Sequence, residues 1–160
     1  MPIMLSQKET MLLNDLKNHE VLCIEKYTAY AGQAHDPQLK QLFTDLASQE
    51  QQHLNTLNQI ASGQVLNMAQ QGQQHQQQQQ QAKPSVPPGI SPAVPNQNDA
   101  VMCNDLLMAE KYVSGAYNTA IFEFRDTNVR KALNHIQKEE QEHGEKLFNY
   151  MQQKGMYKMQ

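Results

Sequence analysis

Two Glu-x-x-His motifs are the part of this 160-residue sequence whose residue types and spacing best suit chemistry. The first, within SQEQQH, pairs Glu50 with His53, and the second, within KEEQEH, pairs Glu140 with His143. Because residues three apart lie on the same face of a helix, each motif directs a carboxylate and an imidazole the same way. Carboxylates and imidazoles are ligands for iron and manganese, so the motifs suggest metal chemistry on two helices.

Two further glutamates, Glu20 and Glu110, occupy similar positions on the expected buried faces of two other helices. Apolar residues at alternating spacings of three and four mark the face that a bundle helix buries. The four predicted stripes are Leu13, Leu16, Glu20, Cys23 and Tyr27; Leu39, Leu42, Leu46, Glu50, His53, Leu57 and Ile60; Cys103, Leu106, Glu110, Val113 and Tyr117; and Val129, Ala132, Ile136, Glu140, His143, Leu147 and Tyr150. Six polar side chains therefore interrupt an otherwise largely apolar core.

The two halves of the sequence align without a gap at an offset of ninety residues. The tripeptide NDL occurs at 14–16 and again at 104–106. Further identical pairs are Glu20 and Glu110, Tyr27 and Tyr117, Asp36 and Asp126, Glu50 and Glu140, His53 and His143, and Leu57 and Leu147. An internal duplication is the simplest explanation of this pattern.

Each half is predicted to form a helical hairpin. Ser6 with Glu9 is a potential capping box, Asp36 and Asp126 are N-cap residues, and Gly63 suits the end of a helix. The expected helices cover residues 7–34, 37–62, 99–124 and 127–154. The hairpins are thus residues 7–62 and 99–154, followed by a short tail at 155–160.

A linker of unusual composition, residues 63–98, separates the two hairpins. Eleven of the eighteen residues from 64 to 81 are Gln, and five Pro fall between 84 and 95. Such a segment has too little apolar surface to fold, so it is expected to be disordered or loosely helical with an extended end. Its roughly 30 to 37 Å reach as a flexible chain allows a crossover along the bundle. The whole chain, 1–160, is then a single domain.

Packing the hairpins antiparallel about a pseudo-two-fold axis would bring all four glutamates to mid-bundle. Two like charges 4 Å apart repel by about 4 kcal/mol at an effective dielectric constant of 20, so the cluster must take up protons or cations. One Glu from each of two helices and a Glu-x-x-His from each of the others is the ligand set of di-iron and di-manganese carboxylate bundles. The predicted metal ligands are Glu20, Glu50, His53, Glu110, Glu140 and His143. The alternative is a network of protonated carboxyls and histidines that satisfy one another.

The bulk properties exclude several classes of function. The net charge is −3 and no basic stripe is present, which argues against nucleic-acid binding. No run of about twenty apolar residues suggests a membrane span, and the first residues do not resemble a signal peptide. Cys23 and Cys103 are expected to be core residues of a protein from a reducing compartment.

The segments NDLLMAEKYVSGAYNTAIFEFRD and LNHIQKEEQEHGEKLFNYMQQKGMY resemble the spore coat protein F family, and the six-residue pattern resembles the ferritin-like superfamily. These resemblances imply an all-α, ferritin-like antiparallel four-helix bundle. They also imply a protein made in the cytoplasm during sporulation, located in the spore coat, with other coat proteins or further copies of itself as partners. By the same resemblance, Glu20 and Glu110 would be terminal metal ligands, Glu50 and Glu140 would bridge, and each histidine would hold one metal.

The favoured function is accordingly a structural or assembly component of the spore coat. The alternative is a di-iron or di-manganese protein that stores or oxidises metal, with ferroxidase as the enzymatic variant. No catalytic residue is assigned, because no substrate or electron donor is identified. Glu139 departs from the repeat, since Gln49 aligns with it. Tyrosines 27, 30, 112 and 117 are expected to fill space in the core, and histidines 19, 35, 75 and 135 to lie at the surface.

Overall fold

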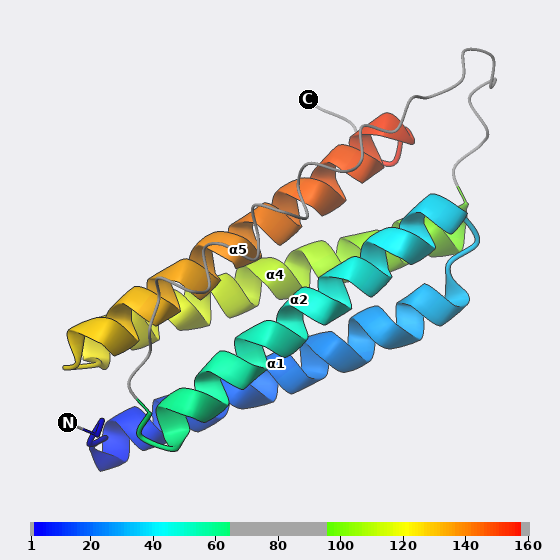
Figure 1. Ribbon diagram of the computed structural model, residues 1–160. Coiled ribbons are helices and arrows are strands. Elements are labelled where there is room, and N and C mark those ends of the chain that lie inside the picture. The colour runs from blue at the N-terminus through cyan, green and yellow to red at the C-terminus, as the bar shows by residue number, and fades with distance from the viewer. Residues whose placement is uncertain (1, 65–95, 158–160) are drawn as a thin grey trace, which may run out of the picture.

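The computed structural model describes residues 2–64 and 96–157, which form four helices and, within those ranges, no strand (Figure 1). The helices are α1 (Gln7–Gln33), α2 (Pro37–Ala61), α4 (Gln97–Glu123) and α5 (Thr127–Gln153). The predicted boundaries hold to within one residue except at the start of α4. Most of the predicted linker, and His75 with it, lies outside the described residues.

The predicted helix signals act as expected. The N–H of Ser6 donates to Glu9 Oε2 (2.6 Å), while the N–H of Glu9 donates to Ser6 Oγ (3.2 Å), which completes the capping box. Asp36 and Asp126 each accept hydrogen bonds from the first turn of the following helix. Gly63 follows α2 with a φ of 76°, a left-handed conformation that glycine adopts without steric cost. Local sequence therefore determines where these elements begin and end.

Helix α4 begins at Gln97, two residues before the predicted start. The reason is Asn96, whose side chain accepts hydrogen bonds from the N–H groups of Asn98 and Asp99 and so serves as the N-cap. This leaves the Asp99 carboxylate in the first turn, where it accepts hydrogen bonds from the backbone N–H groups of His35 (2.9 Å) and Asp36 (3.1 Å). The start of the second hairpin thereby binds the turn of the first.

The reciprocal contact occurs at the other end of the bundle. Glu9, which aligns with Asp99, accepts a hydrogen bond from the backbone N–H of Arg125 (2.8 Å), in the turn between α4 and α5. Two buried carboxylates thus hold the hairpins in register. Burial raises the pKa of Glu9, but the hydrogen bonds from Arg125 and Ser6 outweigh this and lower it to about 2.

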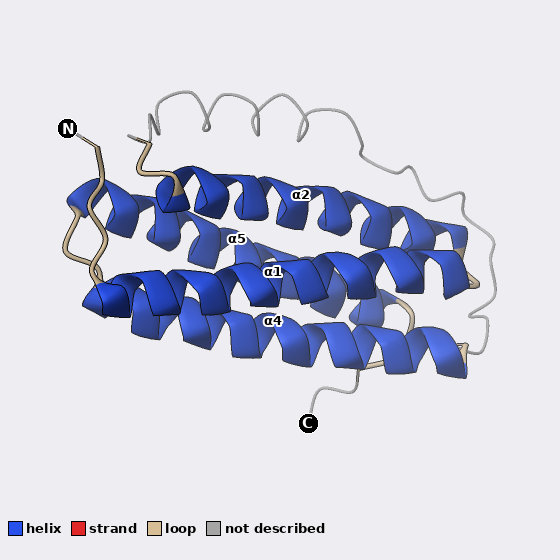
Figure 2. Ribbon diagram, turned by 90° about the horizontal axis from the view of Figure 1, so that it is seen from below, coloured by secondary structure: helices blue, strands red, loops and turns tan. Residues whose placement is uncertain are grey.

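The four helices pack as an antiparallel bundle, so the predicted all-α architecture is confirmed. Helix α1 lies against α2 and α4, and α5 lies against α4 and α2 (Figure 2). Tyr150, near the end of α5, donates to Asp36 (2.6 Å) at the start of α2, which shows that these two helices are also antiparallel. Gly63 contacts Ile3 at one end of the bundle, and Asn96 lies at the other end. The described part of the first hairpin therefore ends at one end of the bundle, and the second hairpin begins at the other.

The core consists mainly of the predicted apolar residues, with one correction in α2. Leu42 was predicted to be buried but is only half-buried, whereas Phe43 is fully buried. Phe43 continues a regular alternation of four and three residues from Leu39 to Ile60, which Leu42 would break.

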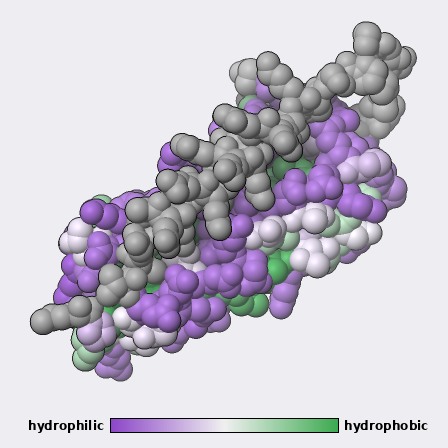
Figure 3. All heavy atoms as spheres, in the orientation of Figure 1, coloured by the Kyte–Doolittle hydropathy of each residue, from purple (hydrophilic) through white to green (hydrophobic). Residues whose placement is uncertain are grey.

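The visible face in Figure 3 is mostly hydrophilic around the grey atoms. Among the described helices, none has the length and hydropathy needed to cross a membrane.

Candidate metal centre

The structure brings all six predicted ligands together in the middle of the bundle. Glu20 comes from α1 and Glu110 from α4, while α2 and α5 each supply one Glu-x-x-His pair. Each of the six residues is at most 2% exposed. Because every helix contributes to one buried cluster, the position of each side chain depends on the packing of both hairpins.

The six residues form two overlapping sets of four donors. One set is Glu20, Glu50, His53 and Glu140, and the other is Glu50, Glu110, Glu140 and His143. Within each set, one ligand atom per residue lies within 4.8 Å of all the others. Two carboxylates, those of Glu50 and Glu140, belong to both sets. This sharing is the arrangement expected of bridging ligands.

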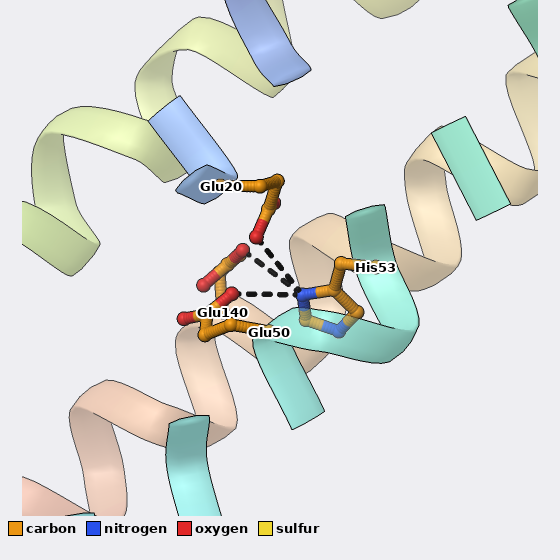
Figure 4. Close-up of side chains that lie close together, drawn as sticks. All are labelled: Glu20, Glu50, His53 and Glu140. Carbon is orange, nitrogen blue, oxygen red and sulfur yellow. Dashed lines mark hydrogen bonds and ion pairs between the residues drawn. The ribbon is translucent and has the colours of Figure 1, made fainter. Parts of the chain in front are cut away.

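In the first set, three carboxylates point toward the same nitrogen of His53 (Figure 4). The Nδ1 atom of His53 lies 3.0 Å from Glu50 Oε2, 3.2 Å from Glu140 Oε1 and 3.7 Å from Glu20 Oε2. The glutamates reach this point from three different helices. The nitrogen and oxygen atoms therefore converge closely enough to hold one cation between them.

The second set repeats this arrangement around His143. Its Nδ1 lies 3.1 Å from Glu50 Oε1, 3.4 Å from Glu110 Oε1 and 3.4 Å from Glu140 Oε2. The rings of His53 and His143 are stacked, with centroids 5.5 Å apart and an angle of 15° between their planes. The two histidines thus stand side by side, each with Nδ1 directed at its own set of carboxylates.

Two tyrosines contact the centre from the opposite hairpin. The hydroxyl of Tyr27 donates to Glu110 Oε1 (2.5 Å), and the hydroxyl of Tyr117 donates to Glu20. The prediction that these residues simply fill the core was incomplete, because helical spacing shows which face a ring occupies but not what its hydroxyl reaches. The other two tyrosines contact different groups, and the prediction that Tyr112 fills the core is wrong, because this residue is 69% exposed. Tyr30 donates to Asp105 (2.6 Å), and the exposed Tyr112 packs edge-on against His19.

The outer nitrogens of the two histidines have different partners. His53 Nε2 lies 2.6 Å from a carboxylate oxygen of Glu139, whereas His143 Nε2 lies 2.7 Å from the amide oxygen of Gln49. Glu139 and Gln49 occupy aligned positions in the two hairpins, so the same place holds an anion on one side and a neutral amide on the other. When each Nε2–H donates outward, Nδ1 keeps a lone pair for a ligand in the centre.

Sequence reasoning missed this outer layer. His135 was predicted to lie at the surface, and its side chain is 33% exposed, but its Nε2 also lies 3.1 Å from Glu139, a contact that the prediction did not include. The sequence did contain a signal, namely that Glu139 and Gln49 immediately precede the two glutamates of the motifs. Adjacent helix positions point in different directions, so their approach to the opposite histidine required the packed structure.

The pKa values of the four glutamates in the centre are shifted in opposite directions, two upward and two downward. Burial raises the pKa of Glu50 to about 7, and burial with neighbouring carboxylates raises the pKa of Glu140 well above its usual range. Burial also raises the pKa of Glu20 and Glu110, but contacts with neighbouring side chains, including a histidine and a tyrosine hydroxyl for each, leave both pKa values lowered. Protons and cations therefore compete for the same oxygen atoms.

Three carboxylate oxygens of the centre lack any hydrogen bond within the described part of the chain. They are Oε2 of Glu20, Oε2 of Glu110 and Oε2 of Glu140, and all three are buried. Buried polar groups normally have partners, and an unpaired buried acceptor is costly. Oxygen and imidazole donors suit iron or manganese, so the residues present fit two divalent ions of this kind.

Comparison with known proteins gives three findings. Residues 98–160 match the Coat F domain family. An uncharacterised protein of Bacillus subtilis (strain 168), YusN, is 35% identical over 69 residues, a match that covers 43% of this chain and 63% of that protein. The chain thus spans less than two thirds of the length of this relative.

The third finding concerns the fold. A crystal structure of a two-domain protein from Anabaena variabilis ATCC 29413, which contains DJ-1/ThiJ/PfpI-like and ferritin-like domains, superimposes with a TM-score of 0.65. The match covers 95% of this chain and 38% of that protein, at 14% sequence identity. At such low identity the likeness concerns the fold alone.

Proposed function

We propose that the core of this chain, whose residues 98–160 match the Coat F domain family and whose fold is ferritin-like, holds a dinuclear iron or manganese centre. The observation that carries the proposal is the pair of buried four-donor sets that share Glu50 and Glu140. Ligands common to both sets allow two cations to sit close together, with each carboxylate neutralising part of both charges.

The energetics of the cluster support cations over an empty polar core. At 4.8 Å, two carboxylates repel by about 3.5 kcal/mol at an effective dielectric constant of 20. Four glutamates and two histidines in one core also carry a desolvation cost that leucines of similar size would avoid. Protons on Glu50 and Glu140 would relieve part of the repulsion, whereas two divalent ions would relieve it and also satisfy the unpaired oxygens.

Each residue has a role in this proposal. Glu20 and His53 would hold one ion, Glu110 and His143 the other, and Glu50 with Glu140 would contact both. Tyr27 and Tyr117 would fix the carboxylates they contact, while Glu139 and Gln49 would fix the imidazole rings. The bound metal would supply Lewis acidity and one-electron redox chemistry to a site that is otherwise made only of acids and imidazoles.

The direct test is metal analysis of protein loaded anaerobically with Fe(II) or Mn(II) and then desalted. We expect about two equivalents per chain, as in other carboxylate bundles with this donor set. Glu50→Ala and Glu140→Ala should lose both, whereas Glu25→Gln, at an exposed position of α1, should bind as the wild type does. Wild-type protein that takes up no metal from either salt would refute the proposal.

The Coat F match favours a second proposal, which concerns when the protein is made and where it is located. We propose that the protein is made during sporulation and associates with other proteins in the spore coat, where the bundle serves as an assembly component. A fluorescent fusion expressed from the native promoter should label the periphery of developing spores. A uniform signal in vegetative cells would contradict this. Oxygen consumption on adding Fe(II) separately tests whether the centre acts as a ferroxidase.

A further inference from the structure

The two histidines of the centre have unequal partners at equivalent positions of the two hairpins. His53 Nε2 lies 2.6 Å from Glu139 Oε2, whereas His143 Nε2 lies 2.7 Å from Gln49 Oε1. Glu139 and Gln49 align at the offset of ninety residues, and each lies on the helix opposite the histidine that it contacts. The duplicated sequence therefore differs at a pair of residues that touch the centre.

A second contact holds Glu139 in this position. Its other oxygen, Oε1, lies 3.1 Å from Nε2 of His135, and only 8% of the Glu139 surface is exposed. The side chain of His135 is 33% exposed, so water screens the charge that this ring carries when it is protonated. The residue that aligns with His135 is Asp45, which is exposed and accepts a hydrogen bond from Gln41. A buried anion therefore stands behind His53 only.

This difference changes how well each imidazole can bind a cation. When Nδ1 of His53 binds a cation, Nε2 carries the proton and donates it to the carboxylate of Glu139. The ring of His143 would donate to a neutral amide oxygen instead. A carboxylate acceptor makes the imidazole a stronger electron donor to a metal. The carboxylate also attracts a divalent cation more than the single proton that competes for Nδ1, because the Coulomb energy scales with charge.

We propose that the two metal positions differ in affinity, and that Glu139 makes the position formed with Glu20 and His53 the tighter one, which fills first. The proposal rests on the dinuclear centre proposed above. Glu139 is a positioning residue, since it contacts the imidazole of His53 and acts on the cation through it. Loss of such a partner typically costs about 10- to 100-fold in metal affinity, so we expect the two positions to differ by about ten-fold or more.

The test measures Mn(II) binding by electron paramagnetic resonance, in which unbound Mn(II) gives a sharp signal that is broadened on binding. Each position is measured alone, because two ions that share ligands influence each other. Glu110→Gln removes a ligand from the His143 position, and Glu20→Gln removes the aligned ligand from the His53 position. Glu110→Gln should bind one Mn(II) about ten-fold or more tightly than Glu20→Gln does.

Exchange of the two outer residues then identifies the cause. Added to Glu110→Gln, Glu139→Gln should weaken Mn(II) binding by about ten-fold or more, and added to Glu20→Gln it should have a much smaller effect. Gln49→Glu added to Glu20→Gln should tighten binding at the His143 position. Such a gain in affinity is a result that simple damage to the structure would not produce.

Glu142→Gln is the matched control, because it makes the same chemical change on α5 at a side chain that is 41% exposed and ion-paired with Lys138 (3.8 Å). It should leave the affinity of either position unchanged. If a double variant fails to fold, Glu139→Gln and Gln49→Glu in the wild-type background should each narrow the gap between the two stepwise dissociation constants.

Two results would contradict the proposals, and they differ. Wild-type protein that binds no Mn(II) would overturn both the dinuclear centre and the inequality of its positions. Wild-type protein that binds two Mn(II) ions, with affinities that neither Glu139→Gln nor Gln49→Glu alters, would overturn the inequality alone.

Discussion

Replacing a shared carboxylate should damage metal binding more than replacing an unshared one. Glu140 belongs to both donor sets, whereas Glu20 belongs to only one. Glutamine is nearly isosteric with glutamate but lacks the charge, so Glu140→Gln and Glu20→Gln change the ligand set with little change in packing. Both residues are fully buried, which makes the two substitutions a matched pair.

The expected size follows from the linkage between binding and folding. A metal present at a hundred times its dissociation constant stabilises the folded state by about 2.7 kcal/mol per site, or about 5.4 kcal/mol for two. In a domain of this size, 1 kcal/mol corresponds to about 2 to 4 °C in Tm, so the wild type should gain about 11 to 22 °C. Glu20→Gln should keep about half of that gain, and Glu140→Gln should keep little of it.

The assay is thermal unfolding followed by circular dichroism at 222 nm, with and without Mn(II), for each protein. Comparing each variant with its own metal-free form cancels any change in intrinsic stability, which the loss of a buried charge is bound to cause. Glu25→Gln, at an exposed position on α1, provides the control and should gain as much as the wild type. Equal gains for Glu20→Gln and Glu140→Gln would refute the reasoning that the two sets share ligands.

Four other substitutions test two buried contacts and two glycine positions. Tyr117→Phe should destabilise the metal-free protein by about 1 to 3 kcal/mol in urea unfolding, because Glu20 loses a buried hydrogen-bond donor; an unchanged midpoint would contradict that contact. Glu9→Gln should cost about 1 to 3 kcal/mol at pH 7, because two backbone N–H groups lose a charged acceptor. Since folding lowers the pKa of Glu9 from 4.5 to about 2, its contribution is present above pH 4.5, and the difference from the wild type should narrow as the pH falls toward 2; a constant difference would exclude this mechanism. Gly63→Ala should lower stability by about 1 to 2 kcal/mol, since φ is 76° there, whereas Gly32→Ala, within α1, should raise it.

Much of the fold was predictable because its signals are local. Ser6, Asp36 and Asp126 mark helix starts through hydrogen bonds to residues two or three positions away, and these act in the same way in any tertiary context. The alternation of apolar residues also indicates which face each helix buries. Leu42 was assigned wrongly where two adjacent apolar residues competed for that face, and only packing favoured Phe43.

The six residues of the centre were also found from spacing, because carboxylates and histidines that interrupt an apolar stripe are rare. That they lie together is a property of the packed bundle, and that they bind metal remains a prediction. Their neighbours could not be found in this way. The contacts of Tyr27 with Glu110, and of His53 with Glu139, join residues more than eighty positions apart on different hairpins.

Local signals in the sequence were thus enough to predict four helices, their ends apart from the start of α4, and the six polar positions of the centre, since these depend on backbone hydrogen bonds and on a period of 3.6 residues. Only the tertiary structure decided which histidine faces Glu139 and which faces Gln49. The physical reason is that these contacts depend on the relative position of two hairpins. Small differences such as Glu139 in place of a glutamine change that interface without changing any local helix signal.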